Sequence, residues 1–174
     1  MRVVSLAGPS DSGKTTLVEQ LVPRLAEERR VATVKSIHHD IEIDTPGADT
    51  HRHRTAGAET VVGVTPGLTF DITARGKRDP TDEPDDEFFR TDDPELRTLS
   101  RVLTRLERRG YDIVVVEGFS KAPLPTILVG DRDPEAVGGE VVGRGSESLS
   151  GLVETVLGLE PLAARAGSSD ADES

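Results

Sequence analysis

The segment GPSDSGKTT at residues 8–16 constrains the fold more than any other part of the chain. It satisfies the pattern G-x-x-x-x-G-K-[ST], and it lies between the apolar run VVSLA and leucines at positions 17, 21 and 25, which have helical spacing. In that pattern, glycines let backbone N–H groups turn inward, and the helix that follows offers its positive end to phosphate. The segment therefore predicts a phosphate-binding loop that joins a buried strand to a helix.

A nucleotide site of this kind also needs groups that handle phosphate charge and Mg²⁺. Lys14 is placed to act as a catalytic residue that neutralises charge on the outer phosphates, and the hydroxyl of Thr15 to hold the metal. Glu117 closes the apolar run IVVVE, and ligands of open α/β sheets gather at the carboxyl ends of strands. We therefore prefer Glu117 to Asp112, which begins the same strand, as the acid near Mg²⁺; a solvated surface carboxylate is the alternative.

The chain is acidic, with a net charge of -11 over 174 residues, and it contains no cysteine. This charge argues against nucleic acid as a partner, because binding there needs Lys and Arg to displace phosphate counterions. Disulfides and thiolate metal sites are excluded, and no apolar run reaches the roughly 20 residues that cross a bilayer. We expect a soluble, cytoplasmic protein with no membrane partner, whose acidic, lysine-poor surface is typical of salt-loving organisms.

Alternating apolar segments predict an α/β fold of the P-loop NTPase type, a mostly parallel twisted sheet with helices on both faces. Strands are expected at residues 3–6, 31–34, 112–116 and 127–129, and helices at residues 15–28, from 93–95 to 109, and at 149–157. Two runs rich in β-branched residues, 60–64 and 68–72, predict a hairpin-like pair. Pro23 is expected to kink the first helix.

The chain is expected to form one domain over residues 1–161. Within it, residues 77–95 are acidic and interrupted by prolines, which favours a solvated loop insertion held down by Phe88 and Phe89. Residues 162–174 are small, polar and acidic, and we expect a disordered tail there.

The polar segment at residues 37–55 contains every histidine of the chain, and it begins as a predicted loop and ends as a predicted helix from Asp49. Imidazoles are common metal ligands, but the adjacent His38 and His39 would point in different directions, so a polar recognition loop is favoured over a metal cluster. The segment also carries acids that could touch Mg²⁺, water or a pterin, or simply solvate the surface: Asp40, Glu42, Asp44 and Asp49.

Three segments in order, GPSDSGKTTL, VKSIHHDIEIDTPGADTHRHRTAGA and YDIVVVEGFSKAPLPTILV, resemble the molybdopterin-guanine dinucleotide biosynthesis protein B (MobB) family. The resemblance covers most of residues 1–130. It implies a dimeric GTP-binding P-loop protein with weak GTPase activity. Such proteins assist a nucleotidyltransferase, MobA, that attaches GMP to molybdopterin, and molybdopterin itself is a candidate ligand.

The resemblance also implies roles by position. The GTP-binding set is Gly8, Asp11, Ser12, Gly13, Lys14, Thr15 and Thr16, with Thr15 and Glu117 near Mg²⁺; the functional face adds the HHD residues, Asp49, Arg54 and Lys121. Asp40 is hypothesised to orient the attacking water. Two departures are Ser36, where many relatives have histidine, and the extra acidic material at 77–95.

Guanine preference rests on the resemblance alone, because the sequence contains no N-K-x-D motif to read the base. Two other functions stay open at this point. The clustered histidines would suit a GTPase that delivers metal, and the loop at residues 37–55 could hold the acceptor hydroxyl of a small-metabolite kinase.

Overall fold

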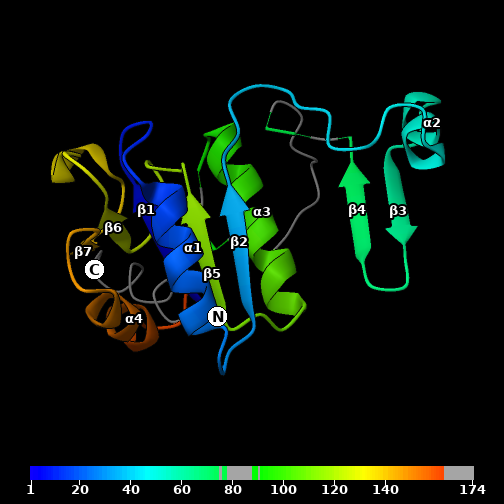
Figure 1. Cartoon of the computed structure of the whole chain (residues 1–174). Coiled ribbons are helices and arrows are strands. Elements are labelled where there is room, and N and C mark those ends of the chain that lie inside the picture. Colours follow the sequence, from blue (N-terminus) through cyan, green and yellow to red (C-terminus); the bar gives the residue numbers. More distant parts are fainter. Residues whose placement is uncertain (75, 78–87, 90, 163–174) are drawn as a thin grey trace, which may run out of the picture. The chain divides into compact units, whose positions relative to one another are not determined.

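The computed structural model describes residues 1–74, 76–77, 88–89 and 91–162 (Figure 1). The chain splits into two compact units: a main unit of Met1–Ser36 with Glu83–Ser174, and a second unit of Ile37–Asp82. The second unit falls within the range 1–161, over which the sequence predicts one domain. Most of the expected acidic insertion and the tail beyond residue 162 lie outside the described residues.

The main unit is built on a parallel sheet of five strands in the order β2-β5-β1-β6-β7. The strands are β1 (Arg2–Ala7), β2 (Val31–Lys35), β5 (Ile113–Glu117), β6 (Thr126–Leu128) and β7 (Val141–Arg144). The strands β1 and β5 are nearly continuous in apolar residues, as strands with both faces covered must be. The predicted, mostly parallel sheet is confirmed.

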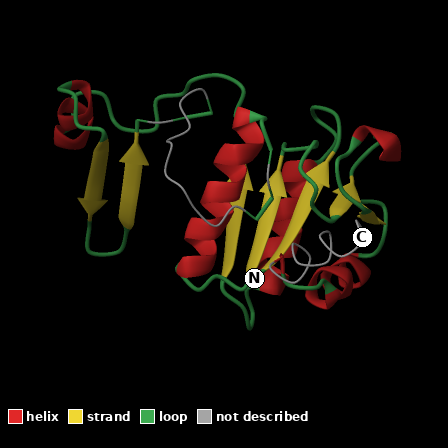
Figure 2. Ribbon diagram, turned by 180° about the vertical axis from the view of Figure 1, so that it is seen from behind, coloured by secondary structure: helices red, strands yellow, loops and turns green. Residues whose placement is uncertain are grey.

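Helices cover both faces of this sheet, as predicted. Alternate residues of β1 and β5 point to opposite faces, so that Val4 and Val115 join one core cluster and Val3 joins the other. The first cluster is closed by α1 (Lys14–Leu25) and α4 (Leu149–Gly158), and the second by α3 (Pro94–Arg108). In Figure 1, α1 lies in front of the sheet, and in Figure 2, from behind, α3 does.

The start of α3 shows how the end of the acidic segment is tied to the core. Asp93 caps the helix, because its carboxylate accepts hydrogen bonds from the backbone N–H groups of Glu95 at 2.9 Å and Leu96 at 3.4 Å. Phe88 and Phe89 pack against the core cluster under α3, as expected from the sequence. Leu162, placed in the expected tail, is instead buried in the same cluster.

The parallel register brings three chain segments together at the carboxyl ends of the strands. Glu117, the last residue of β5, pairs with Leu6 on one side and with Lys35, the last residue of β2, on the other. The loop after β1 therefore leaves the sheet beside Glu117. Asp112 lies at the amino ends of the strands, where its side chain accepts a hydrogen bond from the Arg30 N–H at 2.8 Å.

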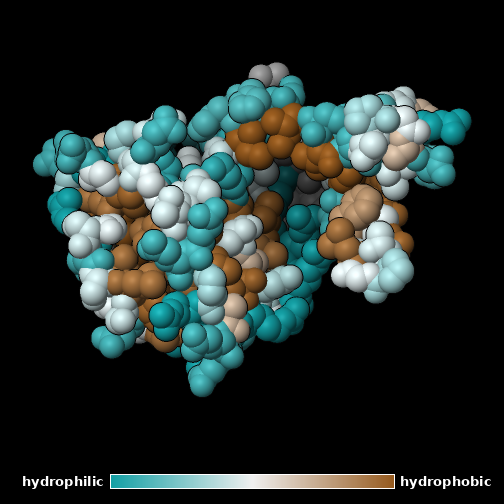
Figure 3. Space-filling model, in the orientation of Figure 1, coloured by the Kyte–Doolittle hydropathy of each residue, from teal (hydrophilic) through white to brown (hydrophobic). Residues whose placement is uncertain are grey.

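The second unit consists of α2 (Asp49–Thr55) and an antiparallel pair, β3 (Thr60–Val64) and β4 (Thr69–Thr73). The predicted helix start at Asp49 and the predicted hairpin are both confirmed. Phe70 lies over Gly63 so closely that a Cβ on the glycine would approach its ring to 2.2 Å. Hydrophobic surface is visible over this hairpin and over the segment that precedes α2 (Figure 3).

Three elements differ from their predictions. The helix expected over 15–28 ends at Leu25, two residues beyond Pro23. The short strand β7 and the single 3₁₀ turn Pro134–Ala136 were not predicted, since neither is long enough to show a period. Across the described ranges, no helix has the length and apolar character needed to span a membrane.

Candidate phosphate-binding site

The loop between β1 and α1 is held in one conformation by close backbone contacts. A Cβ at Gly8 would lie 2.2 Å from the carbonyl oxygen of Val129, so only glycine fits against the end of β6. Gly13 has φ 92, the left-handed conformation that glycine adopts without strain, and Asp11 also has a positive φ of 58. The predicted glycines therefore allow the tight turn and the close approach of the loop to the sheet.

The side chain of Lys14 folds back across this loop. Its Nζ donates to the carbonyl oxygen of Gly8 at 2.9 Å and also to that of Pro9. The ammonium group is thus held against the backbone at the start of the loop. Ser12 Oγ is buried and has no hydrogen-bond partner in the part of the chain that the structure describes.

The first turn of α1 adds a positive end to the loop. Its N-cap is Gly13, which has no side chain to accept a hydrogen bond from the helix amides. The turn also contains no acidic residue that would offset the helix dipole. Free amide groups at a helix start are suited to bind an anion, and Lys14, Thr15 and Thr16 form this first turn.

Glu117 lies beside this helix start. Its two carboxylate oxygens are both 3.5 Å from the Thr15 hydroxyl, and Oε1 is 3.0 Å from the Lys35 ammonium nitrogen. The Glu117 side chain is 12% exposed, against 54% for Lys35. The structure therefore places Glu117 between Thr15, in the helix that begins at Lys14, and Lys35, which only the pairing of β2 with β5 could have disclosed.

Three other predicted residues of the main unit are solvent-exposed. Asp11 lies in the loop, Thr16 lies in the first turn of α1, and Lys121 lies in the segment that connects β5 to β6. Exposure leaves all three accessible to a ligand. None of them is needed to hold the loop in the contacts described above.

In the second unit, the predicted residue Arg54 pairs with an acid of the same unit. Its Nη2 lies 2.6 Å from Glu42 Oε1 and 2.5 Å from Oε2, and His51 Nε2 is 3.7 Å from Oε2. Asp44 accepts hydrogen bonds from the Thr45 N–H at 2.8 Å and the Thr50 hydroxyl at 3.1 Å. These contacts fasten the loop before α2 to the helix.

The remaining predicted residues of the second unit are exposed. Asp49 forms a surface ion pair with Arg52 at 3.5 Å, and Asp40 is exposed in the loop. No group of three or more histidine and acidic side chains that could hold a metal ion is found among the residues described. Within residues 37–55, exposed polar and histidine side chains stand beside the exposed aliphatic side chains of Ile41 and Ile43.

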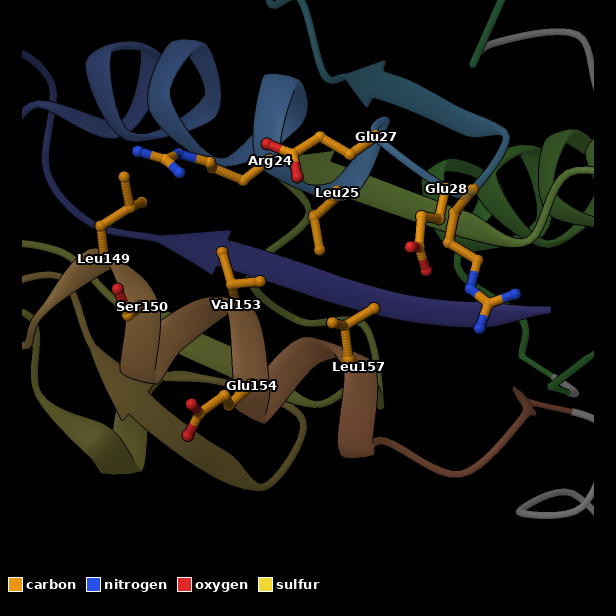
Figure 4. A pocket seen from close by; sticks show the side chains of 10 residues that line it. Arg24, Leu25, Glu27, Glu28, Leu149, Ser150, Val153, Glu154 and Leu157 are labelled. Atoms are coloured by element: carbon orange, nitrogen blue, oxygen red, sulfur yellow. The ribbon is translucent and has the colours of Figure 1, made fainter.

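A separate groove of about 420 Å³ lies between the end of α1 and α4 (Figure 4). Its floor is apolar, with Leu25, Val153 and Leu157, and Arg24 and Glu154 stand on its rim. Helix α1 has 12 residues and is therefore about 18 Å long. The groove at its last turn is thus far from the loop between β1 and α1. No predicted site residue lines it.

Comparison with known proteins identifies the family of this fold and loop. The family described as Molybdopterin guanine dinucleotide synthesis protein B, MobB, matches residues 3–137. The chain belongs to the MobB family. The resemblance found in the sequence is thereby confirmed.

Two MobB relatives have the name molybdopterin-guanine dinucleotide biosynthesis adapter protein. The protein of Haemophilus influenzae is 33% identical over 128 residues, which are 73% of this chain and 62% of the relative. The protein of Escherichia coli is 30% identical over 129 residues, 73% of this chain and 64% of the relative. The match thus spans less than two thirds of the length of these relatives.

Solved MobB structures share the fold. A crystal structure of molybdopterin-guanine biosynthesis protein B superposes with a TM-score of 0.61 at 27% identity, over 91% of this chain and 99% of that one. The crystal structure of Bacillus subtilis MobB gives a TM-score of 0.63 at 18% identity, over 91% of this chain and 100% of that one. The parallel sheet with helices around it is therefore the MobB fold.

Proposed function

We propose that this chain binds GTP with Mg²⁺, hydrolyses it slowly, and acts as an accessory protein in the cytoplasm. The pathway would be the conversion of molybdopterin to molybdopterin guanine dinucleotide, with a MobA-like guanylyltransferase as partner. The observation that carries the proposal is the loop between β1 and α1, where the Lys14 ammonium contacts the loop backbone and the helix start has no side-chain cap. The names of the MobB relatives supply the pathway.

The residues of the loop would act by binding and orienting phosphate. Backbone N–H groups of the loop and the Lys14 ammonium would neutralise charge on the outer phosphates as water attacks. A hydroxyl and a carboxylate only 3.5 Å apart, those of Thr15 and Glu117, are hard oxygen donors of the kind that Mg²⁺ accepts while keeping several waters. The bound ion would supply charge neutralisation between the phosphates.

We expect slow turnover, because the sequence offers no clear arginine finger or water-positioning residue besides the hypothesised Asp40. Hydrolysis would then regulate how long the chain stays bound to a partner, and would not serve to produce GDP or phosphate. An Asp40→Asn variant should lower the GTPase rate if that carboxylate orients water. An unchanged rate would count against this role.

A second copy of the chain is the other partner that we propose. Support comes from the exposed aliphatic side chains of the second unit, which include Ile43 at 63% and Val64 at 77% exposure. A surface of this kind on a small unit is typical of an interaction site. These exposed residues support the proposed second copy, and the names of the relatives do not bear on it.

The test is equilibrium binding of GTP and ATP with Mg²⁺ at high salt, comparing the natural chain with Lys14→Ala. We expect GTP to bind at least tenfold more tightly than ATP, which is about 1.4 kcal/mol, and Lys14→Ala to lose this binding. Arg24→Ala is the matched control, since it removes a positive charge from the last turn of the same helix. Its affinity should equal that of the natural chain.

Three outcomes would contradict the proposal. A preference for ATP would remove the GTP assignment, and an absence of binding by either nucleotide would remove the nucleotide site. Transfer of label from the nucleotide to a metabolite, in place of release of free phosphate, would establish a kinase instead. The partner test with the guanylyltransferase follows only if GTP binding is found.

A further inference from the structure

A positive charge already occupies the place next to Glu117 where the proposed site needs a cation. Lys35 ends β2 in register with Glu117, and its ammonium nitrogen is 3.0 Å from Oε1. Both oxygens of the same carboxylate are also 3.5 Å from the Thr15 hydroxyl. Glu117 thus bridges the helix start of the phosphate loop and the end of the neighbouring strand.

The backbone that carries Lys35 is firmly held, whereas its side chain has room to move. Ser36, the next residue, donates its N–H to the Glu117 carbonyl at 2.8 Å and its hydroxyl to Glu95 Oε1 at 2.7 Å. The opposite residue, Gly118, is so close that a Cβ there would lie 2.9 Å from the Ser36 Cβ. The Lys35 side chain itself is 54% exposed, so it can leave Glu117 without disturbing the core.

We propose that Lys35 is a positioning residue that occupies the cation's place on Glu117 until Mg²⁺ arrives together with the nucleotide. The inference deepens the proposed function and rests on its assignment of Glu117 to the metal. Lysine suits this task, because its ammonium is a compact charge on a flexible stem and forms no fixed fork with a carboxylate.

The physical basis is competition between two cations for one carboxylate. Mg²⁺ without nucleotide would have to displace the ammonium of Lys35 and then remain close to it, with no further anion to offset the repulsion. Nucleotide phosphates bring that anion and give Lys35 a new partner. Binding of metal and of nucleotide is therefore coupled, and removal of Lys35 should weaken the coupling.

The experiment measures Mn²⁺ binding to the nucleotide-free chain by electron paramagnetic resonance, with Mn²⁺ replacing Mg²⁺ as the observable ion. Lys35→Met keeps an unbranched side chain only one heavy atom shorter and removes its charge, and we expect it to bind Mn²⁺ at least tenfold more tightly than the natural chain. Arg29→Met is the matched control, because it makes the same change in net charge just before β2 begins, at the amino end of the strand that Lys35 ends. It should change the affinity less than about twofold.

A second comparison separates the site from the many surface acids of this chain. In a Glu117→Gln background, Lys35→Met should give no gain in Mn²⁺ affinity, because the carboxylate that the lysine protects is absent. Lys35→Gln, a second uncharged variant, and circular dichroism guard against a loss of folding. Unchanged or weaker Mn²⁺ binding in both Lys35 variants, or a gain that persists without Glu117, would overturn the proposal.

A failure of the proposed role of Lys35 can be distinguished from a failure of the proposed GTP-binding function. The Mn²⁺ titration uses no nucleotide, so a gain in Lys35→Met supports the role of Lys35 whichever nucleotide the chain prefers. GTP binding with no gain in Lys35→Met would leave the proposed function standing and remove the role of this lysine.

Discussion

Gly8 is the residue at which the phosphate loop touches the neighbouring strand most closely. The space for its missing Cβ is taken by the Val129 carbonyl oxygen at 2.2 Å and by Ser12 Oγ at 2.7 Å. A backbone carbonyl cannot turn aside as a flexible side chain can. The loop and the end of β6 are therefore packed tightly together, and the shape of the proposed phosphate site depends on both.

Gly8→Ala should destabilise the main unit by about 1–3 kcal/mol, because the loop must move away from Val129 to admit the methyl group. Urea denaturation measures the loss, and nucleotide binding should fall with it. Gly158→Ala is the control, since a Cβ there meets nothing within 4 Å at the end of α4. Equal stability of the two variants would show that the loop is free to relax.

Glu42 is a residue of the second unit whose ionised form is favoured by its hydrogen bonds. Its pKa lies below the ordinary value of 4.5, first because its carboxylate accepts a hydrogen bond from the Asp44 N–H and then because Arg54 binds it. A lowered pKa means that the folded chain favours the ionised form. The stabilisation is therefore present above pH 4.5 and is lost as the pH falls through the folded pKa.

We expect the free energy of unfolding of the natural chain to decrease between about pH 6 and about pH 3 by more than that of Glu42→Gln. Thermal or urea unfolding at both pH values measures the difference. In Arg54→Gln, the pKa of Glu42 should move back up toward 4.5, which carboxyl NMR can follow. Identical pH dependence in the natural chain and in Glu42→Gln would refute the assignment.

At the scale of elements, helix α3 begins at an N-cap, Asp93, which the sequence predicted as part of the helix start. Asp93 accepts hydrogen bonds from two N–H groups of the first turn, and Pro94 follows at the first helical position. The helix then covers one face of the sheet through Leu96, Leu99 and Leu103. Loss of the cap should therefore affect the main unit and not the helix alone.

Asp93→Ala should lower the free energy of unfolding by about 1 kcal/mol, the usual value of an N-cap. Asp92→Ala removes an equal charge one residue earlier, from an exposed side chain outside the cap, and should have little effect. Urea denaturation of the two variants gives the comparison. Equal effects would mean that the charge near the helix start matters and the cap does not.

The elements that the sequence predicted well are those with a strong periodic pattern or a recognisable boundary. The apolar run before Glu117 and the start of α3 at Asp93 are of this kind. Strand β7 was missed because it has only four residues, Val141–Arg144, with too few apolar positions to show a strand pattern. Its place at the sheet edge follows from pairing with β6, which is a tertiary property.

The site was predictable to the same extent. Lys14, Thr15 and Glu117 belong to patterns that are local in sequence or tied to a strand end, and the structure gathers them. Lys35 was missed, because its meaning arises only from the register of β2 with β5. Arg54 was named for a ligand role, and its ion pair with Glu42 could not have been read from spacing alone.

At the scale of the whole molecule, the proposed dimer can be tested by changing an exposed side chain of the β3–β4 hairpin. Val64→Lys places a charge on a side chain that is 77% exposed, and we expect it to shift a dimer toward the monomer in sedimentation. Leu157→Lys makes a comparable change at α4, on a side chain that is 40% exposed, and should leave the mass unchanged. Dissociation by Leu157→Lys alone would place the interface on the main unit.

The order of the strands also affects how the chain can fold during its synthesis. Strand β1 has β5 and β6 as its sheet neighbours, so it has no partner until most of the chain has left the ribosome. The hairpin β3–β4 needs only the few residues between its strands and can form early. The loop between β1 and α1, although it lies near the N-terminus, therefore takes its final shape late, and until then the apolar strand β1 is unpaired in the sheet, a condition that favours aggregation.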